Sequence, residues 1–82
     1  MSKYPKLINV LPLDNYKLLL TFSNEEERVY DFIPNLNHKF FKDLKDPVLF
    51  SNVHVIDGEI EWQTGQDFCP HTLYEKSEKY SG

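Results

Sequence analysis

The stretch EWQTGQDFCPHTLYE, residues 61–75, contains the change of structure that decides the predicted fold. Residues 59–62 alternate between acidic and apolar side chains, which is the period of a half-buried strand. Gly65 follows in a turn, where it can supply a positive φ, and Pro70 suits the first position of a helix. The stretch therefore predicts a strand, a glycine turn and a helix.

Strand patterns also precede this stretch. Residues 53–56 and 59–62 flank Asp57–Gly58, which is a strong signal for a two-residue hairpin. In the first half of the chain, short polar turns separate three segments of strand composition, at residues 6–12, 16–22 and 28–33. Short connections favour antiparallel pairing, so we expect a meander, with residues 67–68 as a brief later extension of the sheet.

A helical period separates the two groups of strands. A short amphipathic helix over residues 37–45 is predicted from apolar side chains at helical spacing: Leu36, Phe40, Phe41 and Leu44. Adjacent residues on a helix point about 100° apart, so either Phe40 or Phe41 should lie at the rim. Asp46–Pro47 resembles an N-cap and a first helical residue, so a single turn should follow and bring Phe50 into the core.

These elements have the order β-β-β-α-β-β-α. A chain of 82 residues is long enough for one small domain and not for two. We predict a single α+β domain over residues 1–82, with two layers: a mostly antiparallel sheet, and helices packed on one of its faces.

Composition indicates a folded protein and weighs against several functions. Apolar residues make up 40% of the chain and aromatic residues 15%, unlike disordered chains. The formal net charge is -4, which disfavours binding to nucleic acid, and acidic residues are interleaved among Lys39, Lys42 and Lys45. The single Cys excludes an internal disulfide. The N-terminus lacks the pattern of a signal peptide, and no apolar run could span a membrane, so we predict a soluble cytoplasmic protein.

Candidates for thiol or metal chemistry have simpler structural interpretations. Cys69 precedes a predicted helix N-terminus, which lowers a thiol pKa, and His71 is close in sequence. Cys is nevertheless among the most buried residue types, so we interpret Cys69 as core packing or a weak cap. Metal donors occur at Asp67, Cys69, His71 and at His54 or His38, but without paired spacing such as C-x-x-C. We predict no catalytic residue, no metal site and no cofactor.

Asp31 and Asp67 each sit at the end of a predicted strand, next to a break. As a paired acid/base site, the two carboxyl groups would have to face one another across a pocket. The alternative is that each carboxylate accepts backbone N–H bonds in the following turn, and Asp67 could cap the helix at Pro70 or brace Gly65. We favour the structural interpretation for both residues.

Several motifs together resemble a family of small bacterial proteins known as domain-of-unknown-function family 2442. The similarity runs from Val10 to Glu75 and includes YDF at residues 30–32, LKDP at 44–47 and CPHTLYE at 69–75. The family-motif residues, which we expect to be structural, are Asp31, Trp62, Gly65, Asp67, Pro70, Leu73 and Tyr74, accompanied by Phe32 and Ile60. Two positions depart from the pattern: Glu25 stands where the family commonly has Gly, so we expect a reshaped or longer turn, and His71 replaces an acidic residue.

The resemblance implies a compact α+β domain in a bacterial or archaeal cell, with no established activity. Genes of the family often lie beside those of another short uncharacterised family, which implies a paired, toxin–antitoxin-like or regulatory role. We therefore predict a non-catalytic protein-binding or regulatory module, whose partner is the neighbouring gene product or, as a homodimer, a second copy. The alternatives are a nucleic-acid-associated regulator with a lysine-rich face, and a small enzyme that uses Asp67, Asp31 or Cys69.

Overall fold

The strands form two antiparallel sheets. The computed structural model describes residues 4–80. Sheet A has the order β1-β2-β3-β7, with β1 (Leu7–Leu13), β2 (Lys17–Phe22), β3 (Glu27–Asp31) and β7 (Glu78–Lys79). Sheet B has the order β4-β5-β6, with β4 (Val53–Ile56), β5 (Glu59–Trp62) and β6 (Asp67–Phe68). The α+β class is confirmed, but the strands divide between two sheets instead of forming one.

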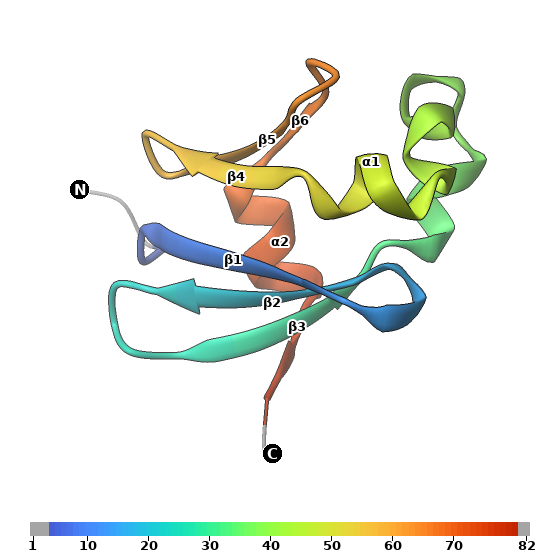
Figure 1. The fold of residues 1–82 in the computed structure, drawn as a ribbon. Coiled ribbons are helices and arrows are strands. Elements are labelled where there is room, and N and C mark those ends of the chain that lie inside the picture. Colours follow the sequence, from blue (N-terminus) through green and yellow to red (C-terminus); the bar gives the residue numbers. More distant parts are fainter. Residues whose placement is uncertain (1–3, 81–82) are drawn as a thin grey trace.

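Short helices connect and cover the sheets. The α-helices are α1 (Pro47–Ser51) and α2 (Pro70–Lys76), and the 3₁₀ segments are η1 (Asp14–Tyr16), η2 (Ile33–Asn37) and η3 (Lys39–Lys45). β1 lies beside β4, so the edges of the two sheets meet, and α2 lies behind β1, β2 and β3 in the view of Figure 1. The side of sheet A that faces α2 is called its inner face below, and the opposite side its outer face.

One aromatic core joins both sheets and the helices. Phe32 is fully buried at the end of β3, and its ring centroid lies 5.1 Å from those of Phe41 and Trp62 and 5.5 Å from that of Phe68. The buried apolar side chains of this core are Leu7, Val10, Leu18, Leu20, Phe22, Tyr30, Phe32, Leu36, Phe41, Leu44, Phe50, Ile60, Trp62 and Leu73. Because aromatic side chains bury large areas, they let such a small chain enclose a core.

The predicted α-helix over residues 37–45 is wrong in type, because η2 and η3 are 3₁₀ segments. A 3₁₀ helix brings residues i and i+3 onto one face, and Phe41 and Leu44 are the buried pair of η3. Phe40 is 59% exposed, as expected for one of the two adjacent phenylalanines. The helix turn after Asp46 is confirmed: Asp46 Oδ1 accepts the Val48 N–H at 2.9 Å, and Phe50 is buried.

The hairpin turns contain several left-handed residues. Asp57 and Gly58 adopt φ values of 52° and 81°, which confirms the predicted two-residue turn between β4 and β5. Glu25 adopts φ 70° between β2 and β3, the left-handed conformation that glycine favours, in a turn that is longer than a two-residue turn, as expected. Residues 23–25 connect Phe22 to Glu26. The Phe22 N–H donates to Glu26 O and the Glu25 N–H donates to Phe22 O, and these two hydrogen bonds close the turn.

The strand β7 was not predicted. Its two residues pair with Arg28 and Val29 of β3, and the Tyr80 N–H donates to Glu27 O at 2.9 Å. A strand of two polar residues is too short to show an alternating pattern, so the sequence does not predict it. Its pairing with β3 depends on where α2 ends. Among residues 4–80, no helix combines the length and the apolar character needed to cross a membrane.

Candidate functional site

Most family-motif residues have a clear structural task. The Asp31 carboxylate accepts the Ile33 N–H at 3.0 Å, as predicted for a turn aspartate. Trp62 is buried, and its indole N–H donates to Phe50 O at 2.9 Å. Gly65 has φ 99°, a conformation that side chains rarely adopt.

The C-terminal part of the motif builds α2. Pro70 starts the helix, and Leu73 lies fully buried beneath it. Tyr74 packs its ring against Phe22 at a centroid distance of 5.0 Å. These three residues therefore position α2 against the inner face of sheet A.

Asp67 is the exception among the motif residues. Its side chain is exposed and makes no hydrogen bond or ion pair within residues 4–80. It does not cap α2, because Cys69 occupies the N-cap position without a side-chain bond. In the β5–β6 pairing Asp67 lies directly opposite Glu61, and like charges in this position destabilise a sheet. Within the part of the chain that the structure describes, this carboxylate thus has no stabilising contact.

The candidate acids do not converge. Asp67, Cys69 and His71 line one open hollow together with Glu59, whereas Asp31 lines a different one with His38 and Lys76. A paired-carboxylate site between Asp31 and Asp67 is therefore not formed. Cys69 is exposed, so its interpretation as core packing is wrong. Within residues 4–80 no three His, Cys, Asp or Glu side chains gather as metal ligands.

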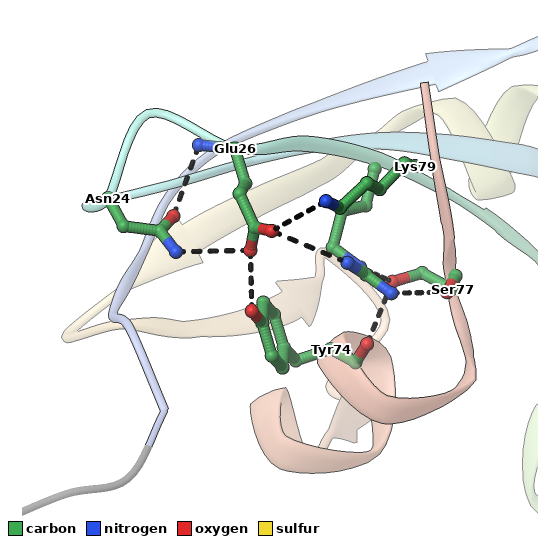
Figure 2. Close-up of polar contacts among 6 residues, drawn as sticks. Asn24, Glu26, Tyr74, Ser77 and Lys79 are labelled. Carbon is green, nitrogen blue, oxygen red and sulfur yellow. Dashed lines mark hydrogen bonds and ion pairs between the residues drawn. The ribbon is translucent and has the colours of Figure 1, made fainter. Parts of the chain in front are cut away.

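The densest polar cluster surrounds Glu26, at the tip of the β2–β3 hairpin (Figure 2). Glu26 Oε2 accepts hydrogen bonds from the Tyr74 hydroxyl at 2.5 Å and from Asn24 Nδ2 at 3.0 Å. The Glu26 N–H donates in turn to Asn24 Oδ1 at 3.1 Å. These contacts hold a hairpin tip against the side of α2, although the two lie 48 residues apart in sequence.

Cations complete this cluster. Arg28 Nη1 lies 3.7 Å from Glu26 Oε1, and Lys79 Nζ lies 3.9 Å from the same atom. Arg28 also donates to Ser77 Oγ at 2.8 Å and to Ser77 O at 2.7 Å, and its guanidinium lies 4.6 Å from the centroid of the Tyr74 ring. Arg28 therefore bridges β3 to the C-terminal end of α2.

The cluster changes the acidity of its two central groups. Hydrogen bonds from Tyr74 and Asn24, with the nearby charges of Arg28 and Lys79, lower the pKa of Glu26 below its ordinary value. The hydrogen bond to the Glu26 carboxylate, together with burial, raises the pKa of Tyr74. The cluster is thus most stable with Glu26 ionised and Tyr74 protonated.

Sequence reasoning missed this cluster. A run of three acidic residues, Glu25 to Glu27, is typical of a solvated hairpin tip, yet the Glu26 side chain is only 23% exposed. Asn24 lies two residues before Glu26, and this spacing is a local signal for a turn in which the Asn side chain accepts a hydrogen bond from a backbone N–H. The partner Tyr74 could not be found from local spacing, because the contact depends on the placement of α2.

The outer face of sheet A carries an apolar row. Leu11 lies opposite Leu19, and Leu19 lies opposite Val29, so the three side chains cross β1, β2 and β3 in register. Leu11 is 51% exposed, and Leu19 and Val29 are partly exposed. The register of β1 with β2 shifts between Leu7 and Asn9, and Ile8 at this shift is 57% exposed. We call Leu11, Leu19 and Val29 the outer row.

The described residues define a small, strand-rich α+β domain whose polar cluster braces its own fold. The model of the family described as "Protein of unknown function (DUF2442)" matches residues 7–79, and the chain belongs to this family. This confirms the resemblance inferred from the motifs. Comparisons with curated proteins and with solved structures found no match.

Proposed function

We propose that this protein is a non-catalytic protein-binding module that acts in the cytoplasm through the outer face of sheet A. The outer row is the observation that carries the proposal. Three apolar side chains lie in register and form a contiguous surface, and Leu11 among them is half exposed. Burial of this surface against a partner would stabilise the complex. The product of the neighbouring gene, implied by the family resemblance, is the first candidate partner.

The separation of the candidate acids supports binding over catalysis. General acid/base chemistry needs groups that lie within hydrogen-bond reach of one substrate. Asp31 is engaged with the Ile33 N–H and lines a different hollow from Asp67. A nucleic-acid role has less support, because the outward positions of β3 carry Glu27 and Asp31, which repel phosphate.

The test is affinity capture with variants of the outer row. A tagged chain carrying Leu11→Asp should lose a partner that the wild-type chain retains, because a carboxylate would be buried in the interface. Val48→Asp is the matched control: Val48 is 67% exposed on α1, outside the strands of sheet A, and the variant should retain the partner.

Both variants should remain folded, since both positions are exposed, and circular dichroism verifies this. Capture that is equal for the two variants would overturn the proposal. So would a wild-type chain that retains no protein, including the neighbouring gene product, when both are expressed together.

A further inference from the structure

The outer row is bordered by carboxylates. On β3, Glu27 and Asp31 lie two residues on either side of Val29 and share its face, and Glu78 of β7 lies opposite Val29. All three are exposed. On β2, Lys17 is the cation at an outward position. The apolar surface therefore has an acidic border along β3 and β7.

This border argues against a second copy as the occupant. A two-fold interface places the same surface on both sides of the contact. Pairing the outer face of sheet A with itself would place the Glu27, Asp31 and Glu78 carboxylates of both copies in one interface, with Lys17 as the outward cation of β2. Like charges in apposition cost binding energy, whereas Lys or Arg side chains on a different partner would gain it.

The edges of the sheets leave little room for an added partner strand. β1 is one edge of sheet A, and it lies beside β4. The opposite edge is β7, which has only two residues, as does β6 at the far edge of sheet B. Strand addition needs a long free edge, so docking on the face is favoured over docking on an edge.

The spacing of the outer row suits a helix. Neighbouring strands lie about 4.8 Å apart, so the row from Leu11 to Val29 crosses the sheet in steps of roughly that length. Apolar side chains three or four residues apart on a helix repeat every 5–6 Å or so. A helix with one apolar stripe can therefore place successive side chains along the row.

We infer, building on the proposed function, that the outer face of sheet A receives an amphipathic helix of the partner protein. The apolar stripe of this helix contacts Leu11, Leu19 and Val29, and its Lys or Arg flank pairs with Glu27 and Glu78. The partner is thus a protein with a basic amphipathic helix.

Three synthetic peptides of about 18 residues test this inference. The first has leucines on one helical face and lysines beside them, the second has glutamates in place of the lysines, and the third has the first composition in scrambled order. Fluorescence anisotropy should show at least a tenfold preference for the lysine peptide over both others, and its affinity should fall as salt rises. Amide NMR shifts should change most at Leu11, Leu19 and Val29.

Paired charge variants locate the contact. Glu27→Lys with Glu78→Lys should reverse the preference between the lysine and glutamate peptides. Glu59→Lys with Glu75→Lys makes the same change of net charge at exposed positions of β5 and α2, and should leave the preference for the lysine peptide within about twofold.

Equal effects of the two double variants, or equal binding of the scrambled peptide, would overturn the inference. Self-association that Leu11→Asp abolishes would also overturn it in favour of a second copy. If the lysine peptide fails while capture still depends on Leu11, the helix inference is wrong and the proposed function stands. If capture is independent of Leu11, the proposed function itself is wrong.

Discussion

At the scale of single residues, Glu25 occupies a conformation that suits glycine. Its φ of 70° costs an L-residue about 1 kcal/mol, and Gly avoids most of this cost while losing some chain entropy. We expect Glu25→Gly to raise the free energy of unfolding by about 0.5 kcal/mol, measured by urea denaturation. Glu25→Ala removes the same side chain without relieving the backbone and should bring no gain. A stabilising Ala variant would show that charge, and not φ, is responsible.

Asp67 is a second residue whose effect can be predicted. Because Asp67 lies opposite Glu61 and has no stabilising partner within residues 4–80, Asp67→Asn should stabilise the fold slightly, by about 0.2–0.5 kcal/mol. Asp31→Ala is the contrasting change: it removes the acceptor of the Ile33 N–H and should cost about 1 kcal/mol. Loss of stability in Asp67→Asn, seen as a lower urea midpoint, would reveal a structural role for this carboxylate.

At the scale of elements, Arg28 joins β3 to α2. Arg28→Met removes both donors to Ser77, which is itself buried, and should cost about 1.5–3 kcal/mol. Lys79→Met removes a cation from the same cluster, but the Lys79 side chain is 76% exposed, so we expect a cost below about 0.5 kcal/mol. Urea denaturation measures both values, and hydrogen exchange should show α2 opening more often in Arg28→Met. Equal costs for the two variants would contradict the bridging role of Arg28.

At the scale of the whole molecule, the cluster predicts how stability depends on pH. The pKa of Glu26 is lower in the folded state than its ordinary value of 4.5, so the folded state prefers the carboxylate. The resulting stabilisation is present above pH 4.5 and is lost as the pH falls through the lowered pKa. For Tyr74 the sign is opposite: its raised pKa gives a stabilisation that is present below pH 10 and lost as the pH rises through the folded value.

Glu26→Gln tests the acidic arm of this prediction. The variant should lose less stability than the wild type between about pH 6 and pH 2, measured as the urea midpoint at each pH. Glu75→Gln, an exposed position of α2, should leave the wild-type profile unchanged. Parallel profiles for wild type and Glu26→Gln would show that the cluster does not set the response to acid.

The turns and strand alternation were predictable because they depend on neighbours in sequence. Asp57–Gly58 forms the hairpin turn, Asp46 caps α1, and Asp31 binds the next backbone N–H, all as local chemistry predicted. The 3₁₀ form of η3 was not predictable from apolar spacing alone, since the same residues fit a short α-helix. Local patterns therefore predicted the kind of element more reliably than its geometry.

The sequence by itself determined the α+β class, the positions of the main strands and the family, because these depend on periodicity, turn residues and motifs. Only the tertiary structure decided that the strands divide between two sheets, that Asp31 and Asp67 lie apart, and that Glu26 meets Tyr74 and Arg28. It also revealed the outer row, because cross-strand register brings together Leu11, Leu19 and Val29 from three separate segments. The physical reason is that contacts between distant segments are fixed by packing and pairing, which no local pattern records.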